Sequence, residues 1–174
     1  VRFLDNIVDV SNYPLKAQQA EAKAKRRIGL GVTGLADALI QLGVRYGSPE
    51  ALVLTDRWLS KLKVAAYEAS AELAEEKGAF ELCDADALLK RPALIALPSE
   101  VRSRIARHGL RNGLLTSIAP TGTISLLAGN VSSGIEPVFD LSYDRRVLRP
   151  DGSARTERVE DYAFALHRRV AGRD

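Results

Sequence analysis

The sequence predicts a helix-rich α/β fold, and three observations carry this prediction. The chain has 174 residues, of which 46% are hydrophobic and 27% charged, which is the balance of a single globular domain. Residues 48–78 form one long helical pattern, and the apolar run Leu114–Ala119 is typical of a buried strand. We therefore expect residues 1–174 to form a single segment of one domain.

Helical patterns dominate the N-terminal part of the chain. A first amphipathic helix is expected to end before Pro14, and its apolar face consists of Phe3, Leu4, Ile7 and Val8. Residues 16–27 are rich in Ala, Gln, Glu and Lys and predict an exposed helix. A short packed helix stopped by Gly43 is marked by Leu35, Ala38, Leu39 and Leu42. Because the chain lacks methionine and opens inside a helix, we expect it to be a piece of a longer protein.

The longest predicted helix begins after Ser48, where a capping hydroxyl, a proline and an acid follow one another. It ends at Gly78, and its stripe consists of Leu54, Trp58, Leu62, Ala65, Ala69 and Leu73. Another helix is predicted over Ser99–His108, between Pro98 and Gly109.

The C-terminal part mixes strands and helices. Strand Leu114–Ala119 should lead through a break at Pro120 into a helical turn over Thr123–Leu127. A half-buried strand is expected over Phe139–Tyr143, and a turn at residues 150–152. The last amphipathic helix is marked by Val159, Tyr162, Leu166 and Val170.

Composition excludes several classes of protein. With one cysteine, Cys83, an internal disulfide is impossible, and the two distant histidines make a Cys/His zinc site unexpected. No apolar run reaches the roughly 20 residues that cross a bilayer, so we expect no membrane segment. The net charge is only +3, and the arginine-rich stretches have neighbouring acids or no interleaved aromatics. We therefore expect no nucleic-acid partner, and a cytoplasmic location fits the disulfide-free composition.

A glycine motif, Gly29-x-Gly31-x-x-Gly34, matches the dinucleotide-binding fingerprint. That fingerprint requires a buried strand before the first glycine, whereas residues 23–27 are Lys-Ala-Lys-Arg-Arg. A Rossmann-type NAD or FAD oxidoreductase is therefore a minor alternative. The simpler interpretation is that these glycines allow close packing of the backbone.

The segment Pro120-Thr121-Gly122-Thr123-Ile124-Ser125 is the stronger candidate site. It places three hydroxyl groups and a glycine at a predicted helix start, where unpaired amide groups can hold an anion without lysine. An ordinary helix cap, which uses one hydroxyl, is the alternative. The sequence thus predicts a phosphate-binding loop at Pro120, Thr121, Gly122, Thr123, Ile124 and Ser125.

Two further residues are less informative. Cys83 lies in a polar stretch with nothing that marks it as a reactive thiol, so we interpret it as a spectator. Glu136 precedes Pro137 in a glycine-containing loop and is interpreted first as a carboxylate that braces the loop.

The stretch from Arg111 to Pro137 closely resembles a signature of ribonucleotide reductase large chains: RNGLLTSIAPTGTISLLAGNVSSGIEP. It is most similar to the adenosylcobalamin-dependent class II enzymes. The segments at residues 1–6, 27–37 and 143–148 resemble the same family in the same order, so the resemblance covers nearly all of residues 1–148.

The resemblance implies a fragment of the family's ten-stranded α/β barrel, with Pro120–Ser125 as the loop that binds the phosphates of a ribonucleoside di- or triphosphate. It also implies conversion of ribonucleotides to 2′-deoxyribonucleotides by cysteine-radical chemistry, with adenosylcobalamin as cofactor and a thioredoxin-type reductant. The family's Asn-Pro-Cys-Gly-Glu motif and redox cysteines are absent here. We expect them in the remainder of the reductase chain, and the fragment alone to be inactive. A free-standing nucleotide-phosphate binding module is the other hypothesis.

Overall fold

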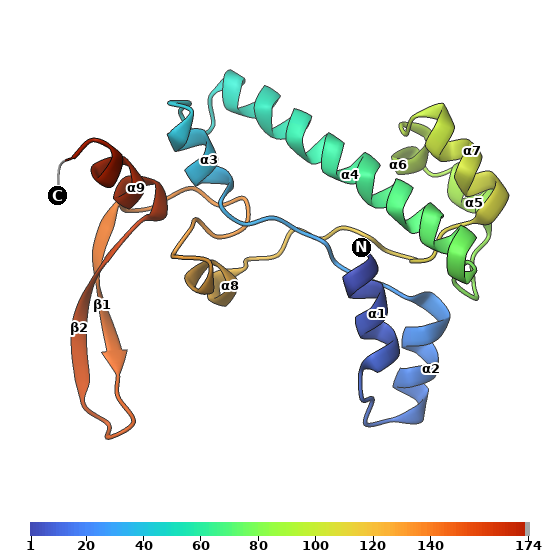
Figure 1. The fold of residues 1–174 in the computed structure, drawn as a ribbon, viewed down its shortest axis with the longest axis horizontal. Coiled ribbons are helices and arrows are strands. Elements are labelled where there is room, and N and C mark those ends of the chain that lie inside the picture. Colours follow the sequence, from blue (N-terminus) through green and yellow to red (C-terminus); the bar gives the residue numbers. More distant parts are fainter. Residues whose placement is uncertain (173–174) are drawn as a thin grey trace. The chain divides into compact units, whose positions relative to one another are not determined.

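The computed structural model describes residues 1–172 and confirms a helix-rich α/β chain (Figure 1). Its helices are α1 (Arg2–Val10), α2 (Lys16–Lys25), α3 (Leu35–Gln41), α4 (Pro49–Lys77), α5 (Ala85–Leu89), α6 (Pro92–Ile95), α7 (Ser99–His108), α8 (Gly122–Leu127) and α9 (Tyr162–Val170). Its strands are β1 (Ser142–Leu148) and β2 (Ala154–Glu160). None of these helices is both long and apolar enough to cross a membrane.

The described chain divides into two compact units. The first consists of Val1–Leu30 and Asp56–Ser117, and the second of Gly31–Thr55 and the residues from Ile118 onward. The expectation of a single domain segment stays a prediction.

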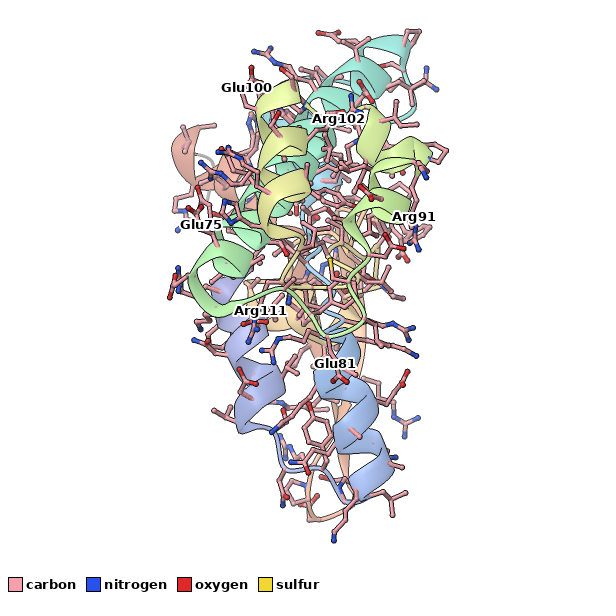
Figure 2. The ribbon with its side chains drawn as sticks, turned by 90° about the vertical axis from the view of Figure 1, so that its right-hand side faces the viewer. Glu75, Glu81, Arg91, Glu100, Arg102 and Arg111 are labelled. Atoms are coloured by element: carbon pink, nitrogen blue, oxygen red, sulfur yellow. The ribbon has the colours of Figure 1, made fainter. Side chains whose placement is uncertain are left out.

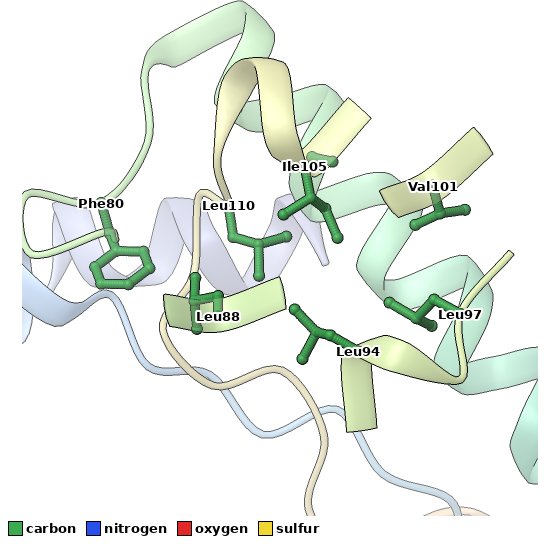
Figure 3. Close-up of a cluster of buried hydrophobic side chains, with 8 residues drawn as sticks. Phe80, Leu88, Leu94, Leu97, Val101, Ile105 and Leu110 are labelled. Carbon is green, nitrogen blue, oxygen red and sulfur yellow. The ribbon is translucent and has the colours of Figure 1, made fainter. Parts of the chain in front are cut away.

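The first unit packs α5, α6 and α7 with part of α4 around an apolar cluster (Figure 3). Ile105 of α7 is completely buried, and Leu94 of α6 is 3% exposed. The prediction of a helix over Ser99–His108 is confirmed with the same bounds. The long helix is confirmed as α4, and the Ser48 hydroxyl caps it by accepting the amide of Ala51 at 3.1 Å.

Charged side chains of both signs cover this unit, Glu75, Glu100 and Arg102 among them (Figure 2). The arginine-rich stretch of α7 meets acids of α4, since Arg104 Nη1 lies 2.7 Å from Glu72 Oε1. Opposite charges are thus paired across the two helices.

A buried carboxylate organises the N-terminal part of the first unit, where α1 and α2 are neighbours (Figure 1). Asp5 is completely buried and accepts hydrogen bonds from Arg26 Nε at 2.8 Å, Arg111 Nε at 3.2 Å and Asn112 Nδ2 at 3.0 Å. Burial by itself would raise the pKa of Asp5, but the hydrogen bonds from Arg26 and Arg111 outweigh it and lower the pKa below its ordinary value.

This network corrects the predicted apolar face of the first helix. Helix α1 is present and ends before Pro14, but Phe3 is 74% and Ile7 42% exposed, whereas Asp5 and Val8 are buried. The sequence pattern marks Asp5 as a surface residue because the cations that neutralise it, Arg26 and Arg111, come from distant parts of the chain.

The predicted buried strand Leu114–Ala119 is also wrong. In the described chain this segment forms one parallel bridge, Leu30 with Thr116, and the side chains of Leu114 and Ile118 are 55% and 67% exposed. The hydrogen bonds from Ile28 N to Leu114 O and from Leu30 N to Leu115 O, at 3.0 and 2.8 Å, pair only one edge of the segment. No described strand pairs with its other edge. The segment therefore makes strand-like hydrogen bonds to residues 28–30 but is not part of a β-sheet.

In the second unit, β1 and β2 form an antiparallel hairpin with the register Ser142↔Glu160 to Leu148↔Ala154. The predicted turn is confirmed by the hydrogen bond from Gly152 N to Arg149 O at 3.0 Å. The strand expected over Phe139–Tyr143 begins later, at Ser142, and Phe139 is 86% exposed. The last helix is confirmed from Tyr162 onward as α9, which packs against α3, whereas Val159, expected on the same helix, lies in β2.

The Asp5 network generates a stability prediction. Asp5→Asn removes the buried charge and leaves Arg26 and Arg111 without their buried carboxylate partner, so unfolding at neutral pH should become easier by about 3 kcal/mol. Asp9, which also binds Arg26 but is 45% exposed, is the matched control, and Asp9→Asn should cost about 1 kcal/mol or less. Urea unfolding of both variants measures this.

The contribution of Asp5 to the free energy of unfolding depends on pH. Because the pKa of Asp5 is lowered by folding, its contribution is present above the unfolded-state pKa and is lost as the pH falls through the folded-state value. Equal stabilities of the Asp5→Asn and Asp9→Asn variants at neutral pH would contradict the role given to Asp5.

Candidate functional site

Three backbone amides are free at the start of α8. Ser125 N donates to Thr121 O at 2.7 Å, which closes the first turn of the helix. The amides of Gly122, Thr123 and Ile124 have no acceptor among residues 1–172, and Thr123 and Ile124 are exposed while Gly122 lines a cavity. These N–H groups are therefore available to a ligand.

That cavity has a volume of about 530 Å³ and lies within the second unit. Gly122 and Thr123 line it, together with Ser133, Glu136, Tyr143 and Arg145. Arg145 lies over the Tyr143 ring, with its guanidinium carbon 5.7 Å from the ring centre, and donates to the Tyr143 hydroxyl at 3.1 Å. The cavity thus offers neutral donors and one cation, Arg145, alongside the carboxyl groups of Glu136, Asp140 and Asp161.

The three hydroxyls of the predicted loop do not play equal parts. Ser125 is 3% exposed, and its hydroxyl donates to Gly122 O at 2.8 Å and lies 3.2 Å from the Ser133 hydroxyl. The Thr121 hydroxyl is bonded within the protein as well. Thr123 is exposed, and its hydroxyl has no partner among the described residues. Of the six predicted residues, Gly122 and Thr123 therefore present free polar groups to the cavity, while Pro120 and Ile124 are exposed without a polar side chain.

The backbone at Thr121 is strained. Its φ of 54° and ψ of 24° lie in the left-handed region, where a β-branched residue is a rare outlier. Such a conformation persists only where surrounding contacts hold it. Here the Thr121 hydroxyl accepts the amide of Gly134 at 2.7 Å and donates to the Thr33 hydroxyl at 3.1 Å.

Residues 130–137 form a loop that lies directly against the candidate site. A side chain at Gly134 would place its Cβ 2.5 Å from Ala119 O, so only glycine fits this close approach, and its φ is +51°. Glu136 N closes a turn by donating to Ser133 O at 2.8 Å. The side chain of Glu136 braces nothing among the described residues, so the expected loop-bracing role is wrong.

Asp37 anchors this loop to α3. Ser132 N donates to Asp37 Oδ2 at 2.6 Å, and Asp37 N donates to the Ser132 hydroxyl at 3.3 Å. Asp37 and Asp161 are 3% and 4% exposed, and both accept the amide of Ala163, at 3.3 and 3.0 Å. Burial raises the pKa of Asp161 to about 6, and the nearby Asp37 carboxyl adds to the rise.

The glycine motif proves to be a packing element. Residues 16–25 before it form α2, and the residues between α2 and the motif make one isolated parallel bridge, Leu30 with Thr116, where the dinucleotide fold requires a buried strand, so this alternative is not favoured. A Cβ at Gly29 would lie 3.1 Å from Ser117 Cβ, so the close-packing interpretation is confirmed at this position. At the other end of the motif, Gly34 N donates to Ser132 O at 2.7 Å.

The remaining reactive side chains lie elsewhere. Cys83 packs against the apolar cluster of the first unit, and its Sγ accepts the amide of Leu110 at 3.5 Å. His108 Nε2 lies 3.8 Å from Glu75 Oε1, and His167 lies on α9. Among residues 1–172, no group of three or more His, Cys, Asp or Glu side chains could hold a metal ion.

Sequence reasoning missed Thr33, Asp37, Ser132 and Gly134. All four act through contacts with residues far away in the chain, such as Thr33 with Thr121 at a separation of 88 positions. The sequence held one indirect signal, namely that Thr33 stands inside the glycine motif.

Comparison with known proteins gives one family. Residues 1–165 match the family model described as ribonucleotide reductase, barrel domain. The chain is 45% identical over 149 residues to a vitamin B12-dependent ribonucleoside-diphosphate reductase of Mycobacterium tuberculosis, which covers 85% of this chain and 19% of that protein. It is 36% identical over 180 residues to the protein of the same name from Thermoplasma acidophilum, covering 98% and 21% respectively.

A more distant relative is the ribonucleoside-diphosphate reductase large subunit of Variola virus, 35% identical over 158 residues, covering 85% of this chain and 20% of that protein. The chain thus spans about one fifth of the length of the curated relatives it matches.

The pair formed by Asp37 and Asp161 generates a pH prediction. In the folded protein Asp161 keeps its proton up to a pH of about 6, whereas the unfolded chain loses it near 3.8. Between these values the folded state binds more protons, so the contribution of Asp161 to stability falls as the pH rises. An asparagine side chain at this position cannot ionise and still caps α9, so Asp161→Asn should stabilise the protein at pH 7 by up to about 3 kcal/mol.

Chemical unfolding across this pH range measures the effect. Asp144→Asn is the matched control, because Asp144 is 61% exposed on β1. A decline of stability between a pH of about 4 and 6 that is equally steep in the Asp161→Asn variant and the wild type would contradict the prediction.

Proposed function

Because this chain belongs to the ribonucleotide reductase barrel-domain family, we propose that it is part of a ribonucleoside-diphosphate reductase. The intact protein would convert ribonucleotides into 2′-deoxyribonucleotides, and this segment would contribute part of the ten-stranded catalytic barrel. The remainder of the reductase chain would supply the catalytic cysteines, since Cys83 is the only cysteine here and packs in an apolar cluster.

We propose that the loop Pro120–Ser125 binds the phosphates of the ribonucleotide substrate. The observation that carries this proposal is the run of three free amides, Gly122 to Ile124, of which the first two belong to residues that line a cavity large enough for part of a nucleotide. Phosphate oxygens only accept hydrogen bonds, and adjacent amides that face one way are the donors that polyphosphates use in other nucleotide sites.

The mode of binding follows from the length of α8. The helix has six residues, so its dipole is small and the anion would be held by individual N–H groups and the Thr123 hydroxyl. Arg145, which lines the same cavity, would add a positive charge. The roles of the loop residues divide accordingly, with Gly122 and Thr123 facing the ligand and Thr121 and Ser125 holding the loop.

Cobalamin dependence is proposed for the intact enzyme, because two of the relatives are named vitamin B12-dependent. The described residues do not form a recognisable site for it. Neither His108 nor His167 lines the cavity beside the loop, and we assign no residue to adenosylcobalamin. A thioredoxin-type reductant and a cytoplasmic location are proposed on the same family grounds.

The alternative, a free-standing nucleotide-phosphate binding module, would use the same loop without the rest of the barrel. The match of residues 1–165 to a reductase barrel family favours the first proposal. The two hypotheses differ in whether the loop works together with catalytic cysteines in one chain.

The loop generates a binding prediction for the intact reductase. Thr123→Val keeps the shape of the side chain but removes its free hydroxyl, so substrate binding should weaken by about 1–3 kcal/mol, the value of a hydrogen bond to a charged group. Titration of the enzyme with a ribonucleoside diphosphate measures the substrate Kd.

Thr156→Val is the matched control, because Thr156 is exposed on β2, outside the residues that line the cavity. A substrate Kd that is unchanged by Thr123→Val would count against the phosphate site.

A further inference from the structure

A continuous chain of hydrogen bonds links the glycine motif to the candidate loop. The Gly134 amide donates to the Thr121 hydroxyl at 2.7 Å, which donates to the Thr33 hydroxyl at 3.1 Å, which donates to the Ser132 carbonyl at 2.8 Å. Every donation runs in the same direction, and each threonine hydroxyl accepts one hydrogen bond and donates one. Such a chain fixes the rotamers of both threonines.

Ser132, at which this series of hydrogen bonds ends, is itself held in place. The Ser132 carbonyl accepts a second hydrogen bond from Gly34 N at 2.7 Å, and the Ser132 amide donates to the buried Asp37. Thr33 therefore connects the strained residue Thr121 to Ser132, which the buried carboxylate of Asp37 on α3 holds in place. All of these residues belong to the second unit.

Thr121 directly precedes the three free amides. Its left-handed backbone sets the direction in which the Gly122, Thr123 and Ile124 N–H groups point, and relaxation of that backbone would turn them. A left-handed threonine relaxes unless its contacts prevent it, because the conformation is sterically unfavourable for a β-branched side chain. The hydroxyl of Thr33 supplies one of the two side-chain hydrogen bonds that hold Thr121.

We propose that Thr33 is a positioning residue for the substrate phosphates, which acts by holding Thr121 so that the free amides of Gly122 and Thr123 stay beside the cavity that these two residues line. This inference rests on the proposed phosphate-binding role of the loop. It also assigns a role to the glycine motif, because the Thr33 hydroxyl and the Gly34 amide both donate hydrogen bonds to the Ser132 carbonyl. Thr33 itself does not line the cavity.

The test uses the intact reductase, with inorganic pyrophosphate as a competitive probe of the phosphate site. Thr33→Val keeps the side-chain shape and removes the hydroxyl, so it should raise the substrate KM and the pyrophosphate inhibition constant together, by about 3- to 15-fold. The kcat should stay within about twofold, because the reacting groups are untouched. Thr33→Ser, which keeps the hydroxyl, should restore both constants, and Thr156→Val should change neither.

A second variant covers the case in which Thr33→Val fails to fold. Thr121→Gly removes the second hydroxyl of the hydrogen-bond series, and glycine adopts the left-handed backbone without strain. This variant should therefore also raise the substrate KM and the pyrophosphate inhibition constant. Melting temperatures report whether each variant is folded.

The outcomes separate this inference from the proposed function. If Thr33→Val and Thr121→Gly leave the pyrophosphate constant unchanged while Thr123→Val raises it, the loop binds phosphate and the positioning role is overturned. If Thr123→Val also leaves it unchanged, the phosphate site itself is overturned. A fall in kcat with unchanged KM and pyrophosphate constant would likewise contradict the positioning role.

Discussion

The conformation of Thr121 is the constraint on which the candidate site depends. A β-branched residue with a φ of 54° returns to an ordinary backbone conformation unless neighbouring groups hold it. The second unit holds it with hydrogen bonds from Gly134 and to Thr33, and with a loop that only glycine allows to come so close. The three amides that follow are the first of helix α8, so they have no partner within the helix, and no other described group accepts from them.

Each unit is organised by a buried carboxylate, but the two acids are stabilised in opposite ways. Asp5 keeps its charge because Arg26, Arg111 and Asn112 donate hydrogen bonds to it, and its pKa is lowered. Asp161 lies beside another carboxyl, Asp37, and holds a proton up to a pH of about 6. Asp5 fixes the position of Arg111 and Asn112 in the first unit, and Asp37, beside Asp161, fixes Ser132 in the loop of residues 130–137 in the second.

The sequence predicted those features that local residues determine. Helices α4 and α7 were expected at nearly the observed bounds, because a capping serine, prolines and glycines mark their ends. The helical turn after Pro120 and the hairpin turn at residues 150–152 have similar local signals.

The buried face of α1 and the state of Leu114–Ala119 were predicted wrongly, because Asp5 is neutralised by distant arginines and the segment pairs with one short stretch of chain. The positions of Thr121 and Ser125 in the loop were expected, but their hydroxyls face inward, a consequence of contacts with Thr33, Gly134 and Ser133 that no sequence pattern records.

The most direct measurement is a crystal structure of the intact reductase with a bound ribonucleoside diphosphate. The account predicts that phosphate oxygens lie at hydrogen-bond distance, about 3 Å, from the amide nitrogens of Gly122, Thr123 and Ile124, with Thr121 still left-handed and bonded to Thr33. Phosphates bound elsewhere, with these amides facing water or bonded to other parts of the protein, would contradict it.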